Sequence, residues 1–329
     1  MKATETKLLD FLKGPKQFLI PIYQRTYSWT RRQCEQLWND VVEAAGSASV
    51  SGHFVGSIVY IEKGLYHQIS SVPQFLVIDG QQRLTTLSLL LSALGVALRE
   101  RGADGDVTQK KLNNYFLFNN EEDGELRYKL LLTQSDKATL LRLLEEKEPP
   151  EPAASRIVEN HRFFADRIAA MDVEPAQLYA GLSKLIIIDV ALNRDHDNPQ
   201  LIFESLNSTG LELSQADLIR NYVLMGLDPG RQESLYDEYW FSMEKEFGRA
   251  GGDSRFDAFI RDYLTLKTKE TRTSAASTRR SRLTPAKPRT NASRRSFGTS
   301  TVIRGTTSAW PWVGKTTRKS ARRSTTSTR

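Results

Sequence analysis

The feature that most constrains the fold is a single stretch, FLVIDGQQRLTTLSLLLSAL, which covers residues 75–94. Its first residues are apolar and rich in aromatic and β-branched types, which predicts a buried strand. From Leu84 onward, leucines recur every three or four residues as far as Leu98, which predicts a long amphipathic helix. Such a helix needs a substantial core to pack against.

Between strand and helix lies a polar junction, DGQQR, at residues 79–83. A strand that ends at Asp79, then a glycine and a helix that begins near Gln81, brings free backbone N–H groups and the positive end of a helix dipole to one point. This predicts an anion site, to which Arg83 adds a charge-assisted contact with phosphate. Asp79 can hold a metal ion or orient a water molecule. The alternative is that Asp79 only caps the helix and that Arg83 pairs with it or with a neighbouring carboxylate.

A second candidate segment is IPIYQRTYSW, residues 20–29, which crowds polar and aromatic groups together. Its aromatic side chains, beside Gln24 and Arg25, suit a base held between rings and read at its edge. A packed strand end with one satisfied arginine explains the same residues.

A third candidate lies in two helices predicted within NPQLIFESLNSTGLELSQADLIRNYVLMGL, residues 198–227. Gly210 breaks the pattern, and Ser214 caps the second helix with Asp217 at the third position. Polar side chains stand at helical spacing beside an apolar face, and they are Asn207, Thr209, Asp217, Arg220 and Asn221. Asp217 and Arg220 also fit a surface ion pair, and Asn207 also fits an ordinary turn.

The sequence offers little for a metal or disulfide site. Its four histidines show no metal-ligand spacing, and its one cysteine, Cys34, excludes an internal disulfide and a cysteine-based zinc cluster. The stretch RDHDNP, residues 194–199, fits solvated loop charges better than a metal site. No stretch approaches the roughly 18 apolar residues of a membrane span, and the N-terminus lacks a signal-peptide core. We therefore expect a cytoplasmic protein.

The N-terminal elements follow from local patterns. Residues 6–13 fit a short helix that stops before a Gly-Pro pair, and KQFLIPIYQR fits an extended segment whose Pro21 suits an edge strand or a strand end. A helix is predicted from Thr30 to Gly46, because Thr30 and Gln33 have the spacing of a capping box.

Further strands are predicted at residues 53–62 and 74–79. Residues 106–182 fit a charged helical region with a Pro-rich break. Residues 185–191 form an unbroken apolar run, which predicts a strand buried on both faces.

The C-terminal residues 271–329 differ in composition from the rest. They carry 15 Lys and Arg and no carboxylate, whereas residues 1–270 hold 31 Lys and Arg and all 39 Asp and Glu. The net charge of +7 therefore belongs to this tail. We expect the tail to be disordered, because it cannot bury enough apolar area to offset the entropy of ordering. Two interpretations stay open, a basic arm that binds nucleic acid and a frame-shifted or otherwise unnatural coding sequence.

Four segments in this order, FLIPIYQRTYSW, HFVGSIVYI, VIDGQQRLTTLSLLL and IFESLNSTGLELSQADLIRNYVL, resemble the N-terminal domain of the GmrSD-type modification-dependent restriction endonucleases. The resemblance covers about residues 8–268. It implies an α+β fold of the ParB/sulfiredoxin-like kind, with a small mixed sheet and helices. The domain is expected to span residues 1–228 with a helical insertion at about 106–182, followed by a helical linker region at 229–270.

The same resemblance implies that DGQQR lies at the centre of a pocket that binds and hydrolyses nucleoside triphosphates. Catalytic roles are predicted for Asp79, Gln82 and Arg83, with Mg²⁺ held by Asp79. Nucleotide-binding roles are predicted for Tyr23, Gln24, Arg25, Gly80, Gln81 and Thr85. Residues that buttress the pocket are predicted to be Asn207, Asp217, Arg220 and Asn221. The base is left open among GTP, CTP, UTP and ATP.

Full-length relatives continue into a His-Asn-His nuclease domain, and here the chain departs from the family pattern. Residues 271–329 contain no His, Asp or Glu, the groups that a metal-dependent nuclease site needs. We expect an NTP-binding and NTP-hydrolysing regulatory domain of an anti-phage restriction protein without its own nuclease site. The alternatives are a nucleotide-gated DNA-binding or partner-docking module without turnover, and a truncated inactive product. The expected partner is DNA, met directly or through a nuclease-bearing protein, and a homodimer is compatible with the sequence.

Overall fold

The computed structural model describes residues 1–47, 51–62, 72–102, 105–170, 174–193, 196–207, 214–249 and 253–268. The tail at 271–329, with the predictions made for it, lies outside these residues, as do Thr209 and Gly210. The chain divides into two units. One consists of Met1–Leu213 with Arg220–Asp228, and the other of Ser214–Ile219 with the chain from Pro229 onward.

The first unit is built on a mixed sheet of six strands in the described residues, in the order β1-β6-β3-β4-β2-β5. The strands are β1 (Lys2–Lys7), β2 (Gln17–Leu19), β3 (His53–Glu62), β4 (Gln74–Asp79), β5 (Leu130–Leu131) and β6 (Leu185–Leu192). β3 runs parallel to β6 and antiparallel to β4, while β2 runs parallel to both of its neighbours. The predicted α+β class with a small mixed sheet is confirmed.

The helices α1–α7 are interspersed with these strands along the chain, and α8–α12 follow the last strand. They are α1 (Leu8–Leu12), α2 (Arg31–Gly46), α3 (Gln81–Glu100), α4 (Gln109–Leu112), α5 (Gln134–Leu144), α6 (Ser155–Ala169), α7 (Pro175–Leu182), α8 (Pro199–Asn207), α9 (Gln215–Leu224), α10 (Pro229–Leu235), α11 (Phe241–Arg249) and α12 (Asp253–Thr268). The capping box that begins α2 is present as predicted, with Thr30 and Gln33 as its partners.

Three expectations need correction. The helix predicted at residues 6–13 begins only at Leu8, because Lys2–Lys7 form the strand β1. KATETK has no apolar face that would predict this strand, which is an exposed edge and pairs antiparallel with β6. Of the two alternatives for Pro21, the edge strand is wrong, since β2 lies between β4 and β5, and the strand end agrees with the structure, because β2 ends at Leu19. The predicted helical region at 106–182 also contains the short strand β5.

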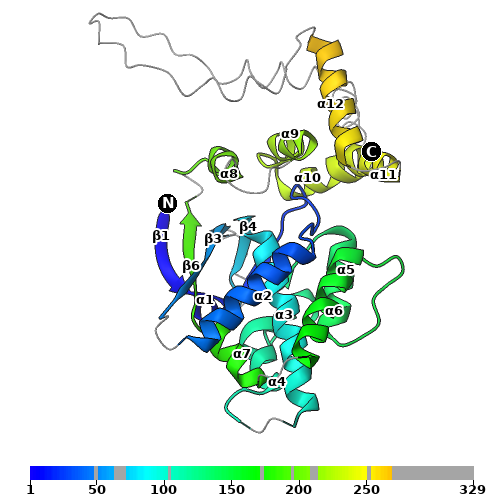
Figure 1. The fold of residues 1–329 in the computed structure, drawn as a ribbon. Coiled ribbons are helices and arrows are strands. Elements are labelled where there is room, and N and C mark those ends of the chain that lie inside the picture. The colour runs from blue at the N-terminus through cyan, green and yellow to red at the C-terminus, as the bar shows by residue number, and fades with distance from the viewer. Residues whose placement is uncertain are drawn as a thin grey trace, which may run out of the picture. The chain divides into compact units, whose positions relative to one another are not determined.

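The main core lies between one face of the sheet and the helices α2, α3 and α6, which Figure 1 shows on the same side of the sheet. Leu89, Leu90 and Leu94 of α3 are fully buried there. Each such side chain contributes about 1.5–3 kcal/mol through burial. The long helix predicted from leucine spacing is therefore the element around which the other helices pack.

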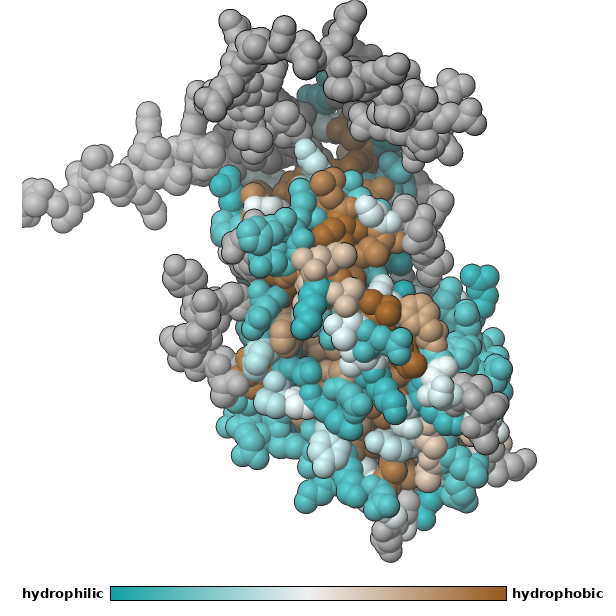
Figure 2. Space-filling view, turned by 90° about the vertical axis from the view of Figure 1, so that its left-hand side faces the viewer, coloured by the Kyte–Doolittle hydropathy of each residue, from teal (hydrophilic) through white to brown (hydrophobic). Residues whose placement is uncertain are grey.

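The opposite face of the sheet carries a smaller apolar cluster. Val59 and Ile61 of β3, Ile78 of β4 and Val190 of β6 pack there with Phe203 of α8. β6 thus contributes to clusters on both faces, as its apolar run predicts. Figure 2 looks at the side on which β1 and β6 lie in Figure 1, and its surface mixes hydrophobic with hydrophilic residues.

Among the helices that the structure describes, none is long and apolar enough to cross a membrane.

We predict that Gly181 is required where α7 crosses α2. A Cβ atom at Gly181 would lie 2.2 Å from the carbonyl oxygen of Val41, which is backbone and cannot turn away. Gly181→Ala should lower the free energy of unfolding by about 1–3 kcal/mol, measured by denaturant titration. Gly46→Ala is the matched control, since nothing lies within 4 Å of its Cβ position. Equal stability of the two variants would contradict the close crossing.

Candidate functional site

The junction between β4 and α3 has the form that the sequence predicts. β4 ends at Asp79, and α3 begins at Gln81 with Gly80 as its N-cap residue. Gly80 has φ 100°, and a Cβ atom there would lie 3.1 Å from Cγ1 of Ile58 and 3.2 Å from the Ser57 carbonyl oxygen. Only glycine fits this turn. Since Gly80 is the N-cap and has no side chain, the interpretation of Asp79 as the cap is wrong.

Arg83 and Asp79 face each other across the first turn of α3. Nη1 of Arg83 lies 3.6 Å from Oδ2 of Asp79 and donates to the Ser57 carbonyl oxygen at 2.5 Å. The side chains keep 29% and 25% of their surface exposed, so both charges reach solvent. The alternative prediction, that Arg83 pairs with Asp79, is confirmed. An exposed pair of this kind is worth only about 0–1 kcal/mol, which leaves both groups available to a ligand.

The space for the Arg83 guanidinium is made by Gly56, a residue that the site prediction missed. Gly56 lies in a β-bulge of β3, between Phe54 and Ser57, with φ 112°. A Cβ atom there would lie 2.7 Å from Nε of Arg83 and 2.8 Å from its Cζ. A glycine inside the strand pattern HFVGSIVYIE is the signal that could have found it, because such a glycine marks a bulge or a close approach.

Three glutamine side chains join the junction to residues 23–29, which we call the motif loop. Gln24, in this loop, is 5% exposed, and its amide nitrogen donates to the carbonyl oxygens of Val77 at 2.6 Å and Ile78 at 3.0 Å in β4. In return, Gln81 donates to the Arg25 carbonyl oxygen at 2.8 Å. The first and second candidate segments therefore lie together.

Gln82 completes this set, and we call Gln24, Gln81 and Gln82 the glutamine clasp. Its Oε1 accepts from the backbone N–H groups of Ser28 at 2.8 Å and Trp29 at 3.1 Å, and its Nε2 donates to the Thr26 carbonyl oxygen at 3.3 Å. The clasp supplies hydrogen-bond partners to the backbone of the motif loop, which in a strand or a helix would come from other backbone groups. In this arrangement the glutamine amides hold the protein's own backbone.

The remaining nucleotide-binding candidates are placed differently. Thr85 is fully buried, and its hydroxyl donates to the Gln81 carbonyl oxygen at 2.9 Å within α3. Tyr23 is 4% exposed, and its carbonyl oxygen accepts from Nε of Arg220 at 2.7 Å. Arg25 is half-buried. Among the predicted catalytic and nucleotide-binding residues, Arg25, Asp79 and Arg83 are thus those whose charged side chains reach the surface.

The third candidate segment contributes through α9. Arg220 is 3% exposed and its guanidinium contacts the motif loop, so the third and second segments also meet. Asn221 is 3% exposed, and its Oδ1 has no hydrogen-bond partner among the described residues. Asp217 belongs to the second unit, where its N–H donates to the Ser214 hydroxyl at 3.0 Å as the predicted cap requires. Asn207 ends α8, and its side chain lies outside the description.

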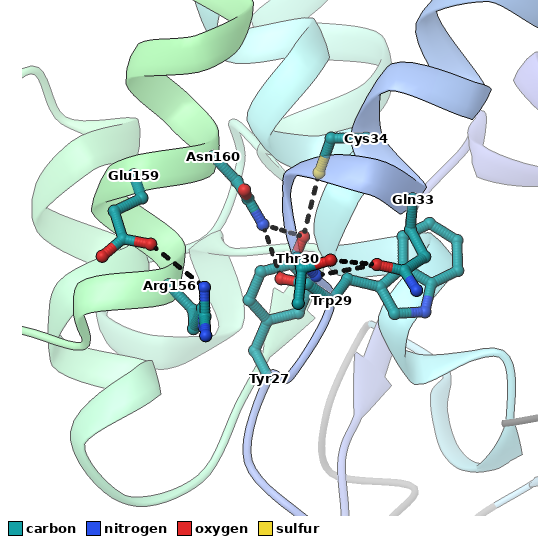
Figure 3. A network of polar contacts seen from close by, with 8 residues as sticks. All are labelled: Tyr27, Trp29, Thr30, Gln33, Cys34, Arg156, Glu159 and Asn160. Atoms are coloured by element: carbon teal, nitrogen blue, oxygen red, sulfur yellow. Dashed lines mark hydrogen bonds and ion pairs between the residues drawn. The ribbon is translucent and has the colours of Figure 1, made fainter. Parts of the chain in front are cut away.

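A buried polar network fixes the motif loop from its other side (Figure 3). Nδ2 of Asn160, in α6, donates to the Tyr27 hydroxyl at 3.0 Å and to the Trp29 carbonyl oxygen at 2.8 Å. The Tyr27 hydroxyl lies 2.7 Å from Oγ1 of Thr86 in α3. Burial raises the pKa of Tyr27, so the hydroxyl stays protonated and able to donate. Sequence patterns carry no signal for Asn160.

Asp136 of α5 also holds the motif loop. It is 4% exposed, and its Oδ2 accepts from the N–H of Tyr27 at 2.5 Å. Burial raises the pKa of this carboxyl to about 6, although the Tyr27 amide favours the ionised form. The loop backbone is therefore held by α3 on one side and by α5 and α6 on the other.

Two cavities lie away from the junction. One is lined by Leu98, Arg101 and Val107, and another by Leu112 and Phe116. Leu98 stands about 25 Å along the helix axis from Gln81, at a rise of about 1.5 Å per residue. Neither cavity belongs to the junction.

We predict that Asp136 makes stability depend on pH. Because its pKa in the folded protein is about 6, against 3.8 when unfolded, the folded state binds the proton more tightly. The free energy of unfolding should therefore fall by about 2–3 kcal/mol as the pH rises from 4 to 6. Asp136→Asn should remove this slope in denaturant titrations at pH 4, 5 and 6. Asp166→Asn, at an exposed position on α6, serves as the control. A slope that survives in the Asp136 variant would contradict the assignment.

Comparison with known proteins gives two matches to this sequence. The model of the GmrSD restriction endonuclease N-terminal domain matches residues 8–224. An uncharacterized protein of Methanocaldococcus jannaschii is 21% identical over 245 aligned residues, and the match covers 64% of this chain. The matched part spans only 40% of the length of that relative. The three candidate segments all contribute residues to the matched range.

Proposed function

We propose a function for this chain from the family to which it belongs, the GmrSD restriction endonucleases, whose N-terminal domain it matches. The proposed function is to bind and hydrolyse nucleoside triphosphates and so to regulate restriction of modified DNA. The observation that carries this proposal is the junction itself. The first turn of α3 has no side-chain cap, and Arg83 is held beside that turn with part of its guanidinium exposed. Uncapped amides and an arginine together favour a phosphate.

The charged residues have different roles in the proposed phosphate site. Arg83 and the first-turn amides of α3 would bind the phosphate oxygens, and Arg83 would exchange its weak pair with Asp79 for the ligand. Arg25 reaches solvent from the motif loop and would add a second positive charge. Gln24, Gln81 and Gln82 act here as positioning residues, because their amides hold the backbone.

Asp79 suits Mg²⁺ only together with the ligand. The described residues contain no group of three or more His, Cys, Asp or Glu that could hold a metal ion. Mg²⁺ commonly binds through one or two carboxylates, several waters and the phosphates of a substrate. A single carboxylate at the end of β4, with 25% of its side chain exposed, fits that pattern. Bound there, Mg²⁺ would neutralise phosphate charge.

We predict that Arg83→Ala abolishes nucleotide binding and leaves the fold intact, because Arg83 contributes only an exposed pair and one backbone contact to stability. Isothermal titration with each of the four nucleoside triphosphates and Mg²⁺ measures the change, and thermal unfolding checks the fold. Arg156→Ala is the control, since it removes an exposed arginine that pairs with Glu159 on α6 (Figure 3). Unchanged affinity in the Arg83 variant would overturn the assignment.

Gly56→Ala should weaken binding without removing any charge. The added methyl group would push the Arg83 guanidinium away from its present place. We expect at least a tenfold loss of affinity, worth about 1.4 kcal/mol, in the same titration. Alanine at φ 112° would also strain the backbone. The affinity is therefore compared at a temperature at which thermal unfolding shows that the variant is fully folded. Full affinity in that folded variant would show that Gly56 does not position Arg83.

A second candidate function is a nucleotide-gated DNA-binding or partner-docking module without turnover. The observation that favours it is that both glutamines of DGQQR are engaged with the motif loop, so neither is free to orient an attacking water. Phosphate release with each nucleotide, with and without DNA, separates the two candidates. Release above a no-enzyme blank supports hydrolysis, and binding without release supports the second candidate.

Residues 271–329 are proposed to contribute no nuclease site. Residues 271–329 contain no His, Asp or Glu in their sequence, so they lack the ligands and base of a metal-dependent nuclease. We propose that the protein acts in the cytoplasm and meets DNA directly or through a nuclease-bearing partner.

A further inference from the structure

The geometry points to Asn160 and Asp136, both outside the four segments of the family resemblance, as positioning residues for the nucleotide site. Asn160 lies on α6 and Asp136 on α5, in the helical region between β4 and β6. Both are buried, and each contacts the motif loop that carries Gln24 and Arg25. The consequence for nucleotide binding rests on the proposed function, whereas the hold on the loop does not.

The first step is a directed chain of hydrogen bonds from α6 to the DGQQR turn. Nδ2 of Asn160 donates to the Tyr27 hydroxyl. The hydroxyl of Thr86 donates to the Gln82 carbonyl oxygen at 2.8 Å, which uses its proton. The Tyr27 hydroxyl must therefore donate to Oγ1 of Thr86. The chain runs from Asn160 through Tyr27 and Thr86 to Gln82, and bonds aligned in this way strengthen one another.

The second step is that Asn160 also fixes the loop backbone. The same amide nitrogen donates to the Trp29 carbonyl oxygen at 2.8 Å. Gln82 accepts from the N–H of Trp29 at 3.1 Å. Trp29 thus binds α6 through its carbonyl oxygen and the DGQQR motif at the start of α3 through its N–H. A shift of α6 or α3 would therefore change the position of the loop.

The third step is the anchor at the centre of the loop. Oδ2 of Asp136 accepts from the N–H of Tyr27, the residue whose hydroxyl is in the chain described above. In the described contacts, the group of this loop that faces Asp136 is a backbone amide. No charged side chain of the loop contacts Asp136 there. A buried carboxylate used in this way needs its acceptor oxygen and does not need its charge.

These contacts define matched substitutions. Tyr27→Phe keeps the ring and removes the hydroxyl, and Asn160→Leu keeps the volume and removes the donor. Asp136→Asn keeps an oxygen that can accept from the Tyr27 amide, whereas Asp136→Leu does not. Ile168→Val, a fully buried residue of α6 that the loop contacts do not involve, controls for a loss of stability alone.

Hydrogen exchange of the full chain tests the hold on the loop without any ligand. We expect amides of residues 26–29 to exchange at least tenfold faster in Tyr27→Phe, Asn160→Leu and Asp136→Leu. Exchange there should change less than twofold in Asp136→Asn and Ile168→Val. The double variant of Tyr27 and Asn160 should exchange no faster than the worse single variant, since both break one chain. Unaltered exchange in the first three variants overturns the proposal.

Titration of the same variants with the four nucleoside triphosphates and Mg²⁺ tests the consequence. We expect the dissociation constant to rise about tenfold to a hundredfold in the first three variants, because misplacing binding groups by about an ångström costs up to that factor. The value should stay within twofold in Ile168→Val and recover in Asp136→Asn. A purely structural role would instead lower the unfolding temperature and leave the dissociation constant of the folded fraction unchanged, which would overturn positioning of the site.

The two failures are distinguishable. If the unmodified protein binds none of the four nucleotides, the proposed function fails, and the exchange data still decide whether α5 and α6 hold the loop. If the unmodified protein binds and the three variants bind equally well, the proposed function stands and the positioning role fails.

Discussion

The structure depends first on the hydrogen bonds between glutamine amides and backbone across the start of α3. Gln24 donates to the Val77 and Ile78 carbonyl oxygens near the end of β4, while Gln81 and Gln82 hold the motif loop. A buried polar group left without a partner costs about 1–3 kcal/mol. The clasp therefore makes strand end, helix start and loop one cooperative unit, and it explains why a polar stretch stands between two apolar elements.

The glutamines satisfy the backbone, so the charged residues are the groups that the proposed function assigns to a ligand. The bulge at Gly56 makes space for the Arg83 guanidinium, and the Ser57 carbonyl oxygen accepts a hydrogen bond from it. Its ion pair with Asp79 is weak. The turn at Gly80 leaves the helix start without a side-chain cap. Under the proposed function, rigidity would come from the clasp and affinity from the charges, so the site would keep its shape when no ligand is bound.

Local patterns predict β3, β4 and α3 well, because each rests on apolar periodicity within its own segment. β1 escapes prediction, since KATETK has no apolar face and becomes a strand only by pairing with β6. The strand–glycine–helix junction at DGQQR is predicted for the same local reason. The role of its glutamines is not, because their partners come from a distant loop, and Asn160 looks like any polar residue of an amphipathic helix until that loop is placed.

The most direct test of the central claim, that the start of α3 binds nucleotide phosphate, is an amide NMR titration of the unmodified protein with each nucleoside triphosphate and Mg²⁺. The account predicts that the largest shift changes fall on Gly80, Gln81, Gln82 and Arg83, with smaller ones in the motif loop. Shift changes confined to other elements, or none with any nucleotide at millimolar concentration, would contradict it.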